Sequence, residues 1–208
     1  MSTSLKVRNI VLVGSFNPST FDKYFFIKNR ILQEEEILPN SLFESIGVNL
    51  LSAKFQITIT FNQFIINSFE DKIIEILVSI IKAANISKVT ALGFNFNWFL
   101  TGEGKSIEQI SKNYFYSDKI NLFSKYFDTA DAMFGVYASK NIKDARLKLD
   151  IKPSVFQEIN NPDSQNIIHI VFNFHFDIKN KDGSELLKYL NDYDYYTEEN
   201  KKIVSLYS

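Results

Sequence analysis

Residues 172–178, FNFHFDI, place an apolar side chain at every second position and a polar side chain in each gap. Side chains alternate between the two faces of a β-strand, so this pattern predicts a strand with one apolar face and one polar face. Such strands are typical of antiparallel sheets that are packed on one side only. The predicted core set is Phe172, Phe174, Phe176 and Ile178, and the predicted outward set is Asn173, His175 and Asp177.

The composition is that of a globular protein, and we expect a single domain over residues 1–208. Of the 208 residues, 45% are hydrophobic and 23% are charged, with a formal net charge of −1. This balance argues against nucleic acid and anionic membrane as partners. The chain has no cysteine, which excludes disulfides and thiolate metal sites. The run IIEILVSIIKAA is interrupted by Glu75 and Lys82 and is too short to span a membrane. We therefore expect a soluble, cytoplasmic protein.

Periodicity predicts the other elements of the chain. Strands are predicted at 7–16, 42–53, 54–67, 88–100, 132–139, 145–152 and 167–178. Helices are predicted at 19–36, 70–85, 106–127, 183–193 and 197–207, with Ser184 and Thr197 as caps of the last two. Together they predict an α+β fold, in which a long, twisted, largely antiparallel sheet carries helices on one face.

The two halves of the chain, residues 1–87 and 88–208, resemble each other in the order of their elements. Each half opens on a strand and a helix, continues with further strands and closes on helix. The stretches ITITFN (57–62) and IHIVFN (168–173) also match in pattern. An internal duplication would explain these similarities. Alternating strands resemble one another by default, however, and this is the simpler explanation.

Three short stretches carry a resemblance to a known group of proteins. They are GSFNP (14–18), the segment ending in EEE (34–36), and VTALGFN (89–95). In these the chain resembles sporadically distributed bacterial proteins that have no characterised activity. The resemblance covers about the first half of the chain and brings no catalytic residues with it. It implies a bacterial protein encoded in a mobile or defence-associated gene neighbourhood.

The stretch FLTGEGKS (99–106) resembles a phosphate-binding loop, because Gly104, Lys105 and Ser106 follow a predicted strand and precede a predicted helix. That motif requires a second glycine five positions before the Gly-Lys pair, and Phe99 occupies this position. We therefore predict that no nucleotide binds here. Ser106 is expected to cap the following helix instead.

The polar face of the predicted sheet is the best place in the sequence to look for chemistry. His175 and Asp177 lie two residues apart, about 6.6 Å along a strand, and could form a base with an orienting carboxylate or part of a metal site. A solvated sheet face explains the same residues without any function. The candidate residues are His169, Asn173, His175, Asp177, Asn95 and Asn97. The sequence predicts no catalytic residue, metal site or cofactor.

The segment NDYDYYTEEN (191–200) mixes aromatic and acidic residues near the end of the chain. Tyr193, Tyr195 and Tyr196 are of a residue type that is enriched at protein interfaces, so the segment is a candidate contact surface. A connection between helices that packs its own tyrosines is the equal alternative.

The first functional hypothesis is a non-enzymatic interaction or scaffold protein that pairs with itself or with another chain, in a bacterial defence or toxin-associated system. The alternative is an enzyme or a small-ligand or metal-binding module that uses the sheet face around His175 and Asp177. A nucleic-acid binder comes third, because the net charge is close to zero.

Overall fold

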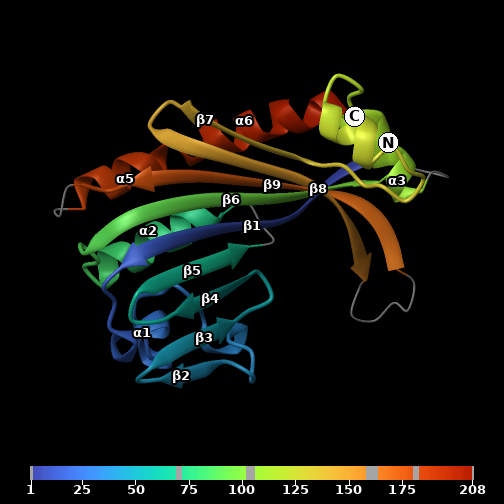
Figure 1. The fold of residues 1–208 in the computed structure, drawn as a ribbon. Helices are drawn as coiled ribbons and strands as arrows, with labels where there is room; N and C mark the ends of the chain where they lie inside the picture. Colours follow the sequence, from blue (N-terminus) through green and yellow to red (C-terminus); the bar gives the residue numbers. More distant parts are fainter. Residues whose placement is uncertain (1, 69–71, 102–105, 158–163, 180–182, 208) are drawn as a thin grey trace.

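The computed structural model describes residues 2–68, 72–101, 106–157, 164–179 and 183–207. Its centre is a nine-stranded sheet, twisted and open, in which every pair of neighbours is antiparallel (Figure 1). The strands are β1 (Ser2–Gly14), β2 (Leu42–Glu44), β3 (Gly47–Leu51), β4 (Phe55–Ile59), β5 (Gln63–Ser68), β6 (Val89–Thr101), β7 (Val136–Ile142), β8 (Ala145–Gln157) and β9 (Ser164–Asp177). Their order across the sheet is β2-β3-β4-β5-β1-β6-β9-β8-β7.

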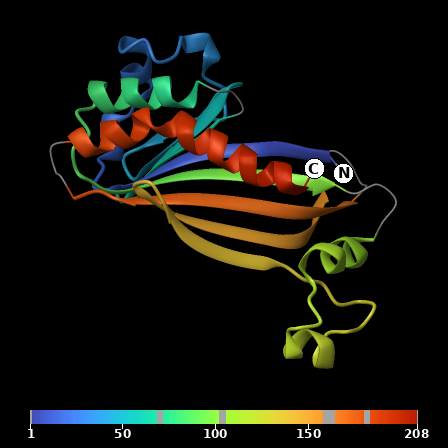
Figure 2. The same ribbon diagram turned by 90° about the horizontal axis from the view of Figure 1, so that it is seen from above.

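Helices cover one face of this sheet, and Figure 2 shows α1, α2 and α6 on the same side of it. The α-helices are α1 (Lys23–Lys28), α2 (Ile73–Ala83), α3 (Ile107–Phe115), α4 (Asn121–Tyr126), α5 (Ser184–Asn191) and α6 (Tyr193–Val204). Short 3-10 helices lie at η1 (Pro18–Thr20), η2 (Glu34–Glu36) and η3 (Ser205–Tyr207). The predicted α+β fold is confirmed. Within the described ranges, none of the helices has the length and apolar character needed to cross a membrane.

The alternation of apolar and polar residues in 172–178 determines which side chains lie on each face of the sheet. Phe94 pairs with Phe174 and Phe96 pairs with Phe172 across β6 and β9, and all four are fully buried. Tyr196 of α6 packs on this layer, with its ring centroid 5.0 Å from that of Phe174. The predicted core side of these strands is therefore confirmed. We call the opposite side, which carries the asparagines, the open face.

The two halves follow the same path through the sheet. In each half the first strand lies at the centre, a helical segment crosses to the outer edge, and a meander of strands returns to pair with that first strand. The first half returns through β2 to β5 and ends on α2, and the second returns through β7 to β9 and ends on α5 and α6. The two first strands, β1 and β6, pair antiparallel at the centre of the molecule. We call the helical segments, residues 15–41 and 106–135, the first and second crossovers.

The helix predicted over 19–36 is wrong in extent. Asp22 caps a helix of six residues by accepting a hydrogen bond from the Phe25 amide at 2.7 Å. The chain leaves this helix at Arg30, whose φ of 55° lies in the left-handed region. The aromatic stripe of a longer helix is present in the sequence, but the chain turns so that Leu32 reaches the core.

The strands predicted over 42–53 and 54–67 are each a hairpin of two strands. In the second hairpin the turn begins at Thr60, whose backbone N–H donates to the Gln63 carbonyl at 2.8 Å. Phe61 therefore lies in the turn, 58% exposed, although its spacing from Ile57 and Ile59 predicted the core face. The alternation changes phase after residue 62, where β5 begins.

The predicted caps at the end of the chain are also wrong. Gly183 occupies the N-cap position of α5 with a φ of 77°, and Ser184 is the first helical residue. Thr197 lies inside α6, where its hydroxyl donates to the Tyr193 carbonyl at 3.1 Å. The helix starts earlier because Tyr193 and Tyr196 point into the core.

Candidate functional site

The asparagines of the open face hydrogen-bond to one another across three strands. The side-chain Nδ2 of Asn95 donates to Oδ1 of Asn9 at 2.6 Å, and the side-chain Nδ2 of Asn173 donates to Oδ1 of Asn95. These residues lie in register on β1, β6 and β9. Their side chains are half-buried, and each uses part of its hydrogen-bonding capacity on its neighbour. The row therefore ties the central strands together.

His169 lies further along the open face, where its Nε2 is 3.1 Å from Oδ1 of Asn97. Its ring also stands edge-on to Phe99, with 5.3 Å between the ring centroids. Burial lowers the pKa of His169, and the positive charge of Lys152 lowers it further. The imidazole is therefore neutral at pH 7, and its Nε2–H donates to Asn97.

His175 and Asp177 are brought together at the end of β9, with Nε2 and Oδ1 3.2 Å apart. Arg146 pairs with His175 across the strands and shares with it a polar pocket of about 310 Å³. The Asp177 side chain is 80% exposed, so water competes for this pair. His169 is six residues away on the same strand, about 20 Å along it, so the two histidines cannot act on one ligand atom.

The donor set for a metal is incomplete on the open face. Across the described ranges, histidine, aspartate and glutamate nowhere gather in a group of three that could hold a metal ion. The predicted face residues are thus divided into an asparagine row, a His169–Asn97 pair and a solvated His175–Asp177 pair. Arg146, His175 and Asp177 line the same polar pocket, which presents a guanidinium, an imidazole and a carboxylate together.

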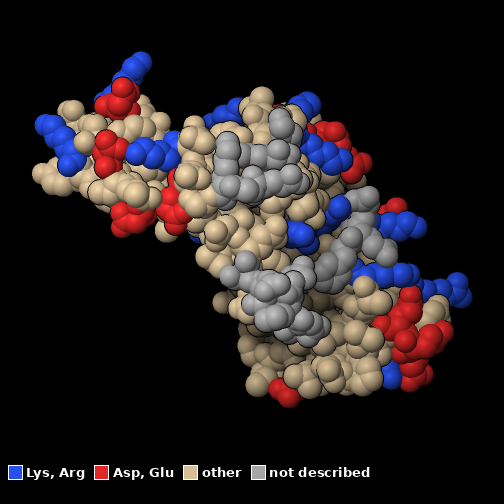
Figure 3. Space-filling model, turned by 90° about the vertical axis from the view of Figure 1, so that its right-hand side faces the viewer, with Lys and Arg blue, Asp and Glu red and all other residues tan. Residues whose placement is uncertain are grey.

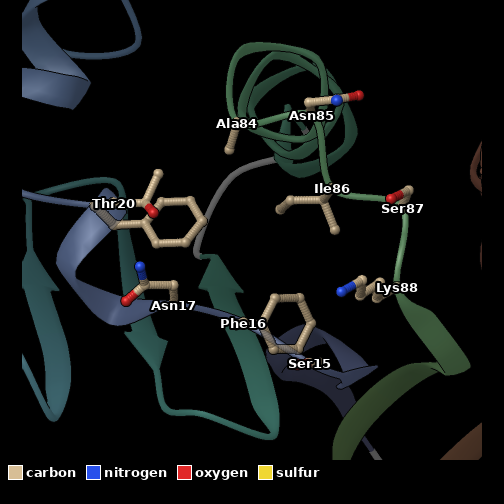
Figure 4. A pocket seen from close by; sticks show the side chains of 10 residues that line it. Ser15, Phe16, Asn17, Thr20, Ala84, Asn85, Ile86, Ser87 and Lys88 are labelled. Carbon is tan, nitrogen blue, oxygen red and sulfur yellow. The ribbon is translucent and has the colours of Figure 1, made fainter.

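A second pocket, which the sequence analysis did not predict, lies at the end of β1 (Figure 4). Its volume is about 190 Å³, and Ser15, Phe16 and Asn17 of the quoted GSFNP motif form one wall. The Ser15 amide donates to the Lys88 carbonyl at 2.9 Å, and a Cβ on Gly14 would lie 2.2 Å from the same oxygen. Glycine is therefore required for this close approach. Lys88 and Asn17 line the hollow beside the apolar side chains of Phe16 and Ile86.

Several large apolar side chains are exposed on the second crossover. We call residues 116–135, which include α4, the arm. It projects from the body of the molecule, at the lower right in Figure 2 and at the upper left in Figure 3. On its inner side Phe134 packs on Phe123 and Tyr116, with ring centroids 5.0 and 5.3 Å apart. Its exposed apolar residues are Ile120, Leu122, Tyr126, Phe127 and Met133.

The arm continues directly into the outermost strand of the sheet. Gly135 joins them, and a Cβ at this position would lie 2.4 Å from the Ile151 carbonyl oxygen. The close contact fixes the point at which the arm leaves β7. On β7 itself Tyr137 is 67% exposed on the open face, and Val136, which points to the opposite face, is also exposed. We call the arm and β7 together the contact surface.

The tyrosines predicted as an interface lie elsewhere. Tyr193 and Tyr196 are buried against Phe94, and burial raises the pKa of Tyr196 to about 12. Only Tyr195 of the three is exposed, at 41%. The packing alternative therefore describes Tyr193 and Tyr196, and these two are not available to a partner.

The residues of the phosphate-loop resemblance fall partly outside the described ranges. Gly104 and Lys105 are outside them. Ser106 is described and caps α3 by accepting a hydrogen bond from the Gln109 amide at 3.4 Å, while the Gln109 side chain accepts from the Ser106 amide. Its predicted role as a helix cap is confirmed.

Comparison with known proteins gives no family for this chain. Neither the scan against protein-family models nor the search of curated proteins found a match.

Proposed function

We propose that this chain is a non-enzymatic interaction protein that binds a protein partner through the contact surface. The main observation in support of this proposal is the exposure of apolar side chains on the arm. The arm exposes five large apolar side chains within residues 120–133 on a lobe that projects from the fold. Contiguous exposed apolar surface is characteristic of sites that another molecule covers.

The chemistry of the arm resembles that of interface centres. Tyrosine, phenylalanine and methionine are enriched at the core of protein interfaces, and Tyr126, Phe127 and Met133 are all exposed on the arm. Charged residues lie among these side chains, as at Lys125 and Asp128, and Asp128 pairs with Lys112 of α3 at 2.6 Å. The exposed aromatic and methionine side chains are therefore the part of the arm best suited to a protein contact.

A matched pair of double variants tests the proposal. Tyr126→Glu with Phe127→Glu places two charges on the arm. Tyr24→Glu with Phe61→Glu places two charges on comparably exposed aromatic residues of the first half. Each chain is used to capture partners from its native host, and the captured proteins are identified by mass spectrometry. We expect the arm variant to lose the specific partner and the first-half variant to keep it. Equal recovery by both variants contradicts the proposal.

The second candidate is a small-ligand module at the polar pocket of β8 and β9. It is favoured by the meeting of Arg146, His175 and Asp177 in that pocket. Thermal unfolding in the presence of small carboxylates and phosphates tests it. A ligand that raises the melting temperature of the parent chain but not that of His175→Ala would support this site over the contact surface.

A nucleic-acid function receives less support. Arg146, Lys148 and Lys152 share the open face of β8, as expected for a small basic patch. Lys152 is paired with Asp150 at 2.9 Å, which reduces the charge available to phosphates. Lysine, arginine and acidic residues are also interspersed on the side seen in Figure 3.

The proposed setting follows from the sequence. We propose a bacterial protein in a defence or toxin-associated gene neighbourhood, which rests on the stated resemblance, and the cytoplasm as its location, which rests on the sequence expectation given above. Inspection of the neighbouring genes tests the proposed neighbourhood.

A further inference from the structure

The contact surface includes a strand edge that is suited to pairing. β7 is the last strand in the order of the sheet, so among the described strands it has a neighbour on one side only. Its outer edge lies along the margin of the molecule in Figure 2. The other outermost strand, β2, has three residues, whereas β7 has seven. Shortness protects the first edge from pairing, and β7 has no such protection.

The register of the β7–β8 hairpin shows which backbone groups point outward. Lys143 and Asp144 form a two-residue turn closed by the pair of Ile142 with Ala145. In such hairpins the closing pair exchanges two hydrogen bonds, and bonded pairs then alternate along the strands. The N–H and C=O groups of the alternate residues face away from β8. These residues are Tyr137, Ser139 and Asn141.

We propose that β7 pairs antiparallel with β7 of a second copy of this chain, with Ser139 opposite Ser139 on a two-fold axis. This inference rests on the proposed interaction function and names its partner. In this register Tyr137 faces Asn141 of the second copy, so the three residues with outward backbone groups, Tyr137, Ser139 and Asn141, face one another across the two chains. The pairing forms about six hydrogen bonds between the two chains. It joins the two sheets into one.

Charge permits this self-pairing. Lys140 is the only charged residue of β7, and in the proposed register it faces Ala138 of the second copy, so like charges are not directly opposite. The arm holds two lysines and three aspartates, and one of these aspartates is paired with Lys112. A surface whose charges nearly balance can meet its own copy without strong repulsion, as a two-fold contact requires.

The antiparallel geometry also gives the arm a place to lie. It sets the start of β7, where the arm joins, beside the β7–β8 turn of the second copy. That turn is held firmly, because Lys143 pairs with Asp192 at 2.7 Å and Asp144 pairs with Lys188 at 3.0 Å. Both charges of the turn are thus neutralised within their own chain. Each arm then covers a fixed, electrically balanced part of the other copy.

Two substitutions at one position separate edge pairing from folding. Ser139→Pro removes an outward N–H while leaving the ladder to β8 intact. Ser139→Ala keeps that N–H and removes only the hydroxyl, which donates to the Leu147 carbonyl at 2.9 Å. Light scattering should give twice the chain mass for the parent and for Ser139→Ala, and the chain mass for Ser139→Pro. Circular dichroism confirms that each variant is folded. A monomeric parent at hundreds of micromolar, or a dimer that Ser139→Pro leaves unchanged, overturns the inference.

The register is tested separately by cross-linking, which is simple because the chain has no cysteine of its own. Ser139→Cys should form an interchain disulfide on mild oxidation, since facing residues lie within disulfide reach. Tyr137→Cys alone should not, but a mixture of Tyr137→Cys and Asn141→Cys should. Lys201→Cys, on the exposed side of α6, is the control.

A chain that is monomeric but still captures a different protein through its arm refutes pairing with a second copy and leaves the proposed function standing. A dimer whose mass is unaffected by the Tyr126→Glu and Phe127→Glu pair supports the β7 pairing and contradicts the role given to the arm.

Discussion

The two crossovers follow the same path from a central strand to a sheet edge, but they end in different environments. The first turns back onto the helix-covered face and buries four of its large apolar side chains there, while Tyr24 and Leu38 stay exposed. The buried four are Phe16, Phe21, Phe26 and Leu32. The second buries the residues of α3 and then leaves the sheet as the arm, with Tyr126 76% exposed. The same topology therefore places one set of aromatic residues in the core and another in solvent.

This difference separates a stability role from a contact role. Burial of one large apolar side chain stabilises a fold by about 1.5–3 kcal/mol, and the first crossover gains this from its own sheet. In the arm, only the inner residues, such as Phe134, contribute this stabilisation by burial. Its outer residues can be buried only by another molecule.

The largest effect is expected on the free energy of unfolding, when one aromatic residue from each crossover is replaced by alanine. Phe26→Ala removes a fully buried ring and should lower the free energy of unfolding by about 3–5 kcal/mol. Tyr126→Ala removes an exposed ring and should change it by about 0.5 kcal/mol or less. Urea unfolding of the two variants at a concentration where the protein is monomeric measures both. Equal losses would show that the arm is part of the fold and not a surface for a partner.

A smaller effect is expected where the arm is attached. Phe134→Ala removes the ring that packs on Phe123 and Tyr116, while the Phe134 amide still donates to the Ser111 hydroxyl. We expect the arm to open locally about tenfold more often, which corresponds to about 1.4 kcal/mol. Limited proteolysis within 116–135 measures this opening. Cleavage that tracks global unfolding instead would mean that the arm and sheet are one cooperative unit.

The smallest effect concerns the protonation of histidine, and both histidines lie in β9 of the second half. The folded-state pKa of His169 is lowered by burial, so the unfolded chain binds the proton more readily. The stabilising contribution is therefore present above the unfolded pKa of about 6.5 and declines as pH falls below it. His169→Gln should show a flatter dependence of stability on pH between 7 and 5. Thermal unfolding at several pH values measures this slope, and identical slopes would refute the assignment.

The sequence alone predicts the centre of the sheet well and its periphery less well. Phe94, Phe96, Phe172 and Phe174 alternate strictly, and alternation is a local signal that requires no tertiary information. The hairpin turn around Thr60 was missed because it contains neither glycine nor proline and because Phe61 continues the alternation. Turn chemistry carried by threonine and asparagine side chains is harder to recognise.

The candidate sites depend on tertiary placement, which explains the remaining differences. Nothing local distinguishes Tyr193, which is buried beneath the sheet, from Tyr126, which is exposed on the arm. Burial of Tyr193 follows from where α6 crosses β6 and β9. Exposure of Tyr126 follows from the direction that Gly135 sets for the arm. The pairing of His175 with Asp177 was predictable because both lie on one strand, while the surrounding pocket was not.

Amide hydrogen exchange along β7 tests the central claim most directly. If a second copy covers this edge, the amides of Tyr137, Ser139 and Asn141 are protected at high protein concentration and lose their protection on dilution. The amides of Ala138 and Lys140, which face β8, should stay protected at every concentration. We expect this concentration-dependent protection at residues 137, 139 and 141 in the parent chain, and we expect the Tyr126→Glu and Phe127→Glu variant to lack it. Fast exchange at residues 137, 139 and 141 at all concentrations, with the protein folded, would contradict it.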